Sequence, residues 1–261
     1  MTDTFDSPCL ESPNTIYARE SGSRRTEMKL RYLPGLVAAL IVVGFVSTAS
    51  AQRTNDPTRW ADTIAAFDAD ASSRPEGAIV LTGSSSFALW RTMENDLAPL
   101  TVIPRGFGGS TMADVLHYVD RLVMPYKPRA VVIYEGDNDS FYGMAPKVVA
   151  GQLKEVISKI HAALPDTRVY VLSVKPSLAR VSVWAKAQET TDLYKRIIAS
   201  DERLHFIDVA TPFLRTDGTV MDDIFIDDGL HLNDKGNRIW ADTIKSKLMK
   251  VEAHYETTAD E

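Results

Sequence analysis

The feature that most constrains this chain is a regular alternation of short apolar runs with longer amphipathic segments. Five runs rich in β-branched or aromatic residues are typical of strands that are buried on both faces. They are 78–82 (AIVLT), 100–104 (LTVIP), 130–134 (AVVIY), 168–173 (RVYVLS) and 204–207 (LHFI). Apolar residues at spacings of three and four predict helices between and after them. These helices cover 111–123, 147–164, 183–200 and 233–251, the last with Asn233 as its N-cap.

The alternation predicts an α/β fold, a three-layer doubly wound sandwich around a central, mainly parallel five-stranded sheet. Parallel strands need long crossover connections, and helices on both faces explain why the strands are apolar throughout. In such sheets, ligands bind at the carboxyl ends of the strands. Polar residues that directly follow a predicted strand are therefore the first candidates for a functional site.

Four polar clusters occupy such positions or precede the last helix. They are 83–86 (GSSS), 105–111 (RGFGGST), 135–139 (EGDND) and 225–233 (FIDDGLHLN). Each has an ordinary interpretation as a cap, a flexible loop or a turn. Together they supply a serine, glycine N–H groups, an asparagine amide and an acid three residues before a histidine. This combination favours acyl transfer, because a histidine oriented by a carboxylate can activate a serine while N–H donors stabilise an oxyanion.

Composition excludes several other functions. The chain has 29 basic and 35 acidic residues, a net charge of −6, and no basic block after the first 31 residues, so nucleic acid is not an expected partner. Cys9 is the only cysteine, which excludes an intramolecular disulfide and a thiolate zinc site. An acidic stretch at 222–228 lacks the glycine and glutamate pattern of an EF-hand. The acyl-transfer chemistry favoured by the four polar clusters gives neither a metal nor an organic cofactor a role, so we expect neither.

The N-terminal part of the sequence contains a predicted targeting segment. From Met28 a short basic region precedes an apolar stretch and an AxA site that ends at Ala51, the three parts of a secretory signal peptide. The apolar stretch is shorter than a membrane span and is interrupted by Pro34, Gly35 and Gly44, which disfavours the alternative of an uncleaved anchor. We interpret residues 1–27 as an extension that precedes the true start. The mature protein is expected to begin at Gln52, in the periplasm or outside the cell, without a transmembrane segment.

The four polar clusters together resemble the sequence blocks of a known protein family. Gly83 with Ser85, Gly109, Asn138 in the GDND run, and Asp228 with His231 are similar to the four sequence blocks of the SGNH hydrolases, also called GDSL esterases. The resemblance covers about residues 77–250. It is strongest to the bacterial branch whose first block reads GSSS, related to the catalytic subunits of platelet-activating-factor acetylhydrolase. Ser84 replaces the usual Asp of the GDS block, but that Asp is not the triad acid of the family.

The resemblance implies a flavodoxin-like SGNH domain over 77–251. An N-terminal helical segment at 52–76 would precede it, and a flexible acidic tail at 252–261 would follow it.

The resemblance also implies a role for each site residue. Ser85 would be the nucleophile, His231 the general base and then acid, and Asp228 the orienting carboxylate. The Ser85 N–H, the Gly109 N–H and the Asn138 side-chain amide would form the oxyanion hole.

The expected substrate is a small-molecule acyl ester. No long apolar insertion is available as a lid, so an acetyl ester on a water-soluble alcohol, such as a carbohydrate O-acetyl group, fits better than a dispersed lipid. The alternatives are a lysophospholipase, a thioesterase or an acyltransferase of the same family. A non-catalytic periplasmic carbohydrate-binding module is a further alternative, although a binder would not need the serine, asparagine and histidine together.

Overall fold

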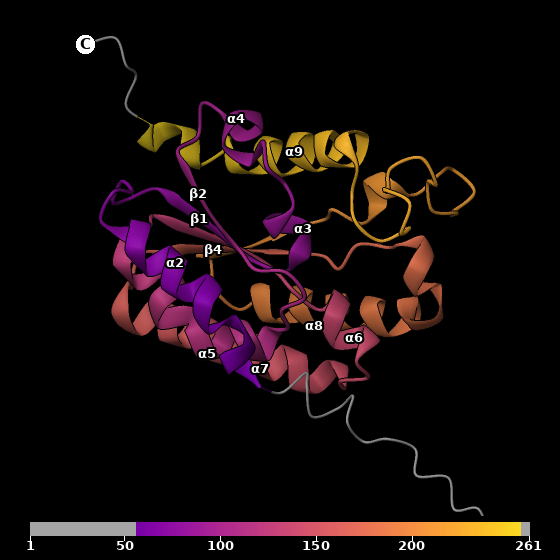
Figure 1. Cartoon of the computed structure of the whole chain (residues 1–261), viewed down its shortest axis with the longest axis horizontal. Helices are drawn as coiled ribbons and strands as arrows, with labels where there is room; N and C mark the ends of the chain where they lie inside the picture. Colours follow the sequence, from indigo (N-terminus) through magenta and orange to yellow (C-terminus); the bar gives the residue numbers. More distant parts are fainter. Residues whose placement is uncertain (1–55, 257–261) are drawn as a thin grey trace, which may run out of the picture. The chain divides into compact units, whose positions relative to one another are not determined.

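The computed structural model describes residues 56–256, and in them five strands form one parallel sheet (Figure 1). The strands are arranged in the order β2-β1-β3-β4-β5, and each neighbouring pair is parallel. Their bounds are β1 Ile79–Gly83, β2 Val102–Gly106, β3 Ala130–Tyr134, β4 Arg168–Leu172 and β5 Leu204–Ile207. The predicted five-stranded α/β fold is confirmed.

Helices cover both faces of the sheet, as Figure 1 shows. On one face lie α2 Ala61–Ala71, α5 Met112–Leu122, α7 Pro146–Ala163 and α8 Trp184–Ile198. On the other lie α4 Met93–Leu97 and α9 Asp234–Leu248. Successive residues of a strand point to opposite faces of the sheet. Val80 therefore packs in the core beneath α2, α5, α7 and α8, and Ile79 packs in the core beneath α4 and α9. Burial on both faces explains the uninterrupted apolar runs.

The predicted strands lie within two residues of the observed ones, and the long helices within three. Asn233 caps α9 as expected, because its side chain accepts the N–H groups of Lys235 and Gly236 at 2.9 and 3.1 Å. Two short helices, α3 Ser85–Ala88 after β1 and α6 Asp137–Phe141 after β3, lie outside the four helices predicted from periodicity. The helix α3 is a single turn and ends two residues before Trp90.

The N-terminal helical segment packs on the sheet through a buried arginine. It consists of a 3-10 turn, Pro57–Trp60, followed by α2. Arg105, only 2% exposed, donates to Asp70 Oδ1 of α2 at 2.5 Å and to the Tyr126 hydroxyl at 2.6 Å. The predicted extension 1–27, the signal peptide 28–51 and the cleavage after Ala51 lie outside the described residues. In the part that is described, no helix combines the length and apolarity needed to cross a bilayer.

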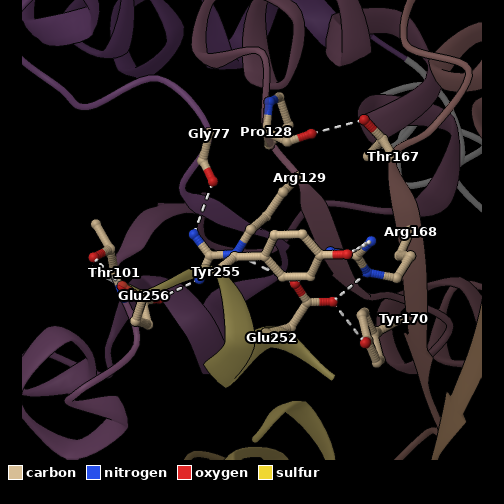
Figure 2. A network of polar contacts seen from close by, with 10 residues as sticks. All are labelled: Gly77, Thr101, Pro128, Arg129, Thr167, Arg168, Tyr170, Glu252, Tyr255 and Glu256. Atoms are coloured by element: carbon tan, nitrogen blue, oxygen red, sulfur yellow. Dashed lines mark hydrogen bonds and ion pairs between the residues drawn. The ribbon is translucent and has the colours of Figure 1, made fainter. Parts of the chain in front are cut away.

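The prediction of a flexible tail from residue 252 is wrong for 252–256. Glu252 is fully buried and accepts hydrogen bonds from Arg168 Nε at 2.6 Å, Tyr170 Oη at 2.7 Å and Arg129 Nε at 3.3 Å (Figure 2). Glu256 accepts the Thr101 N–H at 2.8 Å and also pairs with Arg129. Both arginines lie at the amino ends of their strands, so the acidic residues neutralise cations there. This edge of the sheet lies opposite the polar clusters.

Candidate active site

The candidate nucleophile is placed by a tight turn after the central strand β1. Gly83 has φ +137°, and a Cβ there would collide with the Tyr134 carbonyl oxygen of β3, so only glycine fits. The chain then begins α3, with Ser85 as its first residue. Ser84 and Ser86 are 2% and 5% exposed, whereas Ser85 is half-buried. Of the three serines, Ser85 is therefore the one most accessible to a substrate.

Ser85 is the first member of a continuous chain of side-chain hydrogen bonds. Its Oγ lies 2.9 Å from His231 Nε2, and His231 Nδ1 lies 2.5 Å from Asp228 Oδ2. The other carboxylate oxygen, Asp228 Oδ1, accepts the N–H groups of Leu230 and His231 at 2.8 and 2.9 Å. An ionised carboxylate can only accept, so the proton of the neutral ring is on Nδ1 and Nε2 is free to receive the serine proton.

Asp228 is held in the ionised form that this arrangement needs. Burial acts to raise its pKa, but the hydrogen bonds from the His231 ring and from two backbone N–H groups outweigh burial, and the pKa is lowered. The neighbouring Asp227 is exposed and lies outside this hydrogen-bonded chain. The structure therefore brings Ser85, His231 and Asp228 together, the three side chains expected from the sequence.

The candidate oxyanion donors come from the neighbouring strand ends. Gly109, in the turn after β2, has φ +78°, and within residues 56–256 neither its N–H nor that of Ser85 has an acceptor. The turn approaches the nucleophile, since a Cβ at Gly108 would lie 3.9 Å from Ser85 Cβ. Asn138, on α6 after β3, is 4% exposed, and its Nδ2 donates to the Ser110 carbonyl at 2.8 Å. One N–H of that amide therefore remains for another acceptor.

Two buried acids lie beneath these loops. Glu135 accepts a hydrogen bond from Ser110 Oγ at 2.5 Å, and Asp139 accepts the N–H groups of Met112 and Gly136, each at 3.0 Å. Burial raises the pKa of Glu135 well above its usual range and that of Asp139 to about 7. Their bonds join the start of α5 to the start of α6. Sequence reasoning treated them as turn residues, although acids directly after a fully apolar strand were a signal of burial.

Two cations near the site were also missed. Lys175, 2% exposed, donates to the Leu230 carbonyl at 2.7 Å and so supports the loop that carries His231. Arg180 donates to Asp137 Oδ1 at 2.7 Å and to Asn138 Oδ1 at 2.9 Å. Both follow β4 in a segment without helical or strand periodicity, so no sequence pattern marked them.

Two of the other histidines have structural surroundings, and His117 and His254 are exposed. His161 Nε2 lies 3.0 Å from the Thr167 carbonyl, and the ring of His205 stacks on Tyr170 with centroids 4.5 Å apart. Within residues 56–256, no three His, Cys, Asp or Glu side chains gather as metal ligands would. The chemistry that the site can perform is proton transfer from a serine hydroxyl to an imidazole beside a set of N–H donors.

A parallel α/β sheet with this Ser–His–Asp chain at its carboxyl edge has the arrangement of a serine hydrolase. The chain belongs to the GDSL-like lipase/acylhydrolase family, whose model matches residues 77–239.

Relatives and solved structures agree with this membership. The platelet-activating factor acetylhydrolase IB subunit alpha1 of Pongo abelii is 27% identical over 202 residues, covering 74% of this chain and 84% of the relative. A GDSL-like lipase from Bacteroides thetaiotaomicron superposes with a TM-score of 0.59 at 22% identity, covering 76% of this chain and 98% of that one. A carbohydrate esterase family 3 protein from Talaromyces cellulolyticus gives a TM-score of 0.56 at 17% identity over 68% and 99% of the two chains. The chain is thus an esterase-type hydrolase with the fold of these proteins.

Proposed function

We propose that this protein is a serine esterase that cleaves small acyl esters through Ser85, His231 and Asp228. The observation that carries the proposal is the position of His231, whose two ring nitrogens lie 2.9 Å from the Ser85 hydroxyl and 2.5 Å from the Asp228 carboxylate. A structural histidine has no need to join a half-buried serine to an ionised acid. The same arrangement disfavours a non-catalytic carbohydrate-binding module.

The reaction proceeds in two steps in this proposal. Ser85 Oγ attacks the ester carbonyl carbon while His231 Nε2 takes its proton, and the resulting oxyanion is stabilised by the N–H groups of Ser85, Gly109 and Asn138. His231 then gives the proton to the departing alkoxide, which leaves an acyl group on Ser85. A water molecule, activated by the same imidazole, releases the acid and restores the serine. Asp228 holds the tautomer and stabilises the imidazolium in both steps.

The proposed substrate is a small acyl ester, with an acetyl group on a polar alcohol such as a carbohydrate preferred. An open depression of about 480 Å³ lies beside the segments that carry Ser85 and His231. Leu89, Ile226 and Leu232 line it together with polar residues that include Asn233, Asp234 and Lys235. A small apolar area beside amide, carboxylate and ammonium groups favours a short acyl group with a hydrophilic alcohol. Long-chain lysophospholipids and thioesters are the weaker candidates.

A p-nitrophenyl ester series from acetate to palmitate tests the proposal. We expect acetate and butyrate to give the highest kcat/KM, with Ser85→Ala abolishing turnover and the control Ser84→Ala retaining it. Fastest cleavage of palmitate would contradict the proposed substrate class, and turnover by Ser85→Ala would contradict the mechanism. Product analysis with an added acceptor alcohol separates hydrolysis from acyl transfer, because a transferase would form the new ester.

We also propose that the protein is exported and cleaved after Ala51, as the AxA site indicates. N-terminal sequencing of protein recovered from the periplasm or medium of a bacterial host should find Gln52 first. A terminus at Met1 or Met28 would contradict this proposal.

A further inference from the structure

We propose that Arg180 is a positioning residue that fixes the orientation of the Asn138 amide and so aims its N–H at the oxyanion. The inference rests on the proposed esterase function and adds a residue that neither the family blocks nor the sequence patterns indicate. Arg180 lies in the 3-10 segment Leu178–Val183, which follows β4 and is remote in sequence from Asn138.

The amide orientation follows from the chemistry of its two partners. A guanidinium group can only donate, so the atom 2.9 Å from Arg180 Nη2 must be the amide oxygen of Asn138. A backbone carbonyl can only accept, so the atom 2.8 Å from the Ser110 oxygen must be the amide nitrogen. These two independent contacts exclude the flipped amide. The second N–H is thereby held in one direction, in the plane that the two contacts define.

Arg180 is itself rigidly held. Its Nη1 donates to Asp137 Oδ1 at 2.7 Å, and its guanidinium lies over the Phe141 ring at 4.6 Å from the centroid. Asp137 is also approached by the buried Lys175 at 3.6 Å, so two cations share this carboxylate. The Arg180 side chain is only 11% exposed. Because Arg180 contacts Asp137 and Phe141 as well as Asn138, its guanidinium is held in one position and can fix the orientation of the Asn138 amide. A solvated arginine side chain would not hold that position.

The same short segment also contacts the other half of the site. The Ala179 N–H donates to the Gly229 carbonyl at 3.1 Å, within the loop that carries Asp228 and His231. Residues 179 and 180 therefore join the oxyanion side to the imidazole side. Since a misplacement of about 1 Å can cost about 100-fold in rate, loss of this connection should be visible in kcat.

The test is a double-mutant cycle between Arg180 and Asn138. Arg180→Met, Arg180→Lys, Asn138→Ala and the double variant Arg180→Met with Asn138→Ala would be compared on p-nitrophenyl acetate. The second-order rate constant for labelling of Ser85 by a fluorophosphonate provides a second readout, because the phosphonyl oxygen uses the same donors. Arg121→Met, at the far end of α5, is the matched control, and thermal unfolding verifies that each variant is folded.

We expect Arg180→Met to lower kcat and the labelling rate by roughly 10- to 100-fold, with KM changed less than about twofold. In the Asn138→Ala background the same substitution should have almost no further effect, since Arg180 acts through that amide. Arg180→Lys should recover only part of the loss, because a single ammonium group cannot span Asp137 and Asn138 in the same fork geometry. The Arg121→Met control should match the unaltered protein.

Two results would overturn the inference. One is unchanged kcat in a folded Arg180→Met or, if that variant fails to fold, in Arg180→Lys. The other is a full, additive loss in the Asn138→Ala background, which would mean that Arg180 supports the fold and not the amide. If Ser85→Ala loses all turnover while Arg180→Met does not, the positioning role alone is wrong. If Ser85→Ala retains turnover, both the proposed function and this inference are wrong.

Discussion

Replacing Asp228 by asparagine should have a much larger effect than the same change at Asp227. In the structure, Asp228 Oδ1 accepts two backbone N–H groups, and Oδ2 faces His231 Nδ1 at 2.5 Å. Asparagine has one acceptor oxygen, and the two backbone donors would retain it. The amide NH2 would then face Nδ1 and favour the tautomer with its proton on Nε2, which cannot accept a proton from Ser85.

The magnitude follows from the exposure of the carboxylate. A wrong tautomer can cost up to about 10⁴-fold in kcat, or about 5 kcal/mol of activation free energy. The Asp228 side chain is 41% exposed, so water can take over part of its interaction with the ring. We therefore expect a loss of about 10³-fold in kcat for Asp228→Asn on p-nitrophenyl acetate, with little change in KM. Asp227→Asn should stay within about twofold, because exposed side chains away from the site contribute little.

Thermal unfolding of both variants serves as the control, because Asp228 also stabilises its own turn. A folded Asp228→Asn that keeps more than a tenth of the activity would refute the reasoning about the tautomer. A large loss in Asp227→Asn alone would move the acid by one residue and contradict the geometry.

Three further changes test other parts of the structure. Asn138→Ala should lower kcat by about 100-fold, near 3 kcal/mol for one oxyanion donor, and unchanged hydrolysis would make Asn138 an ordinary turn residue. Glu252→Gln should lower the free energy of unfolding by about 3 kcal/mol in denaturant titrations, because the largely buried Arg168 would lose its carboxylate partner, and a loss below about 0.5 kcal/mol would contradict the network of Figure 2. The pKa of Asp139 is about 7 in the folded protein against 3.8 ordinarily, so the folded state holds this proton more tightly. Its contribution to stability is therefore complete below about pH 4 and lost as the pH rises through about 7. Asp139→Asn should reduce the dependence of the free energy of unfolding on pH between about pH 4 and 7. The same pH dependence in the variant and the unaltered protein would contradict a raised pKa for Asp139.

The layers of the fold could be predicted because each strand is apolar on both faces. Residues 130–134 coincide with β3 in full, since every side chain there is buried. Deviations occur where a single glycine or a short turn sets the boundary. The helix α3, for example, ends at Ala88, and the Trp90 side chain beyond it packs against Trp240 of α9.

Some residues of the candidate site and its supports could be predicted from the sequence, and others could not. The serine cluster at 84–86 and His231 could be found because each lies next to a recognisable element boundary and because the spacing of Asp228 to the histidine is short, whereas the choice of Ser85 among the three serines came from the family resemblance. Arg180 and Glu252 could not, since their partners lie 42 and 84 residues away in sequence and their local surroundings carry no periodic signal. A charged residue in a polar tail has the same sequence appearance whether it is solvated or buried against two arginines. Only tertiary packing separates the two cases.

The central claim is that Ser85 is the nucleophile, and covalent labelling tests it most directly. Protein treated with a fluorophosphonate should gain one adduct by intact mass, and peptide mapping should place it on Ser85, whose Oγ lies 2.9 Å from His231 Nε2. Ser85→Ala should not be labelled, while Ser84→Ala and Ser86→Ala should be. Labelling that persists in Ser85→Ala, or an adduct mapped to Ser84 or Ser86, would contradict this account of the site.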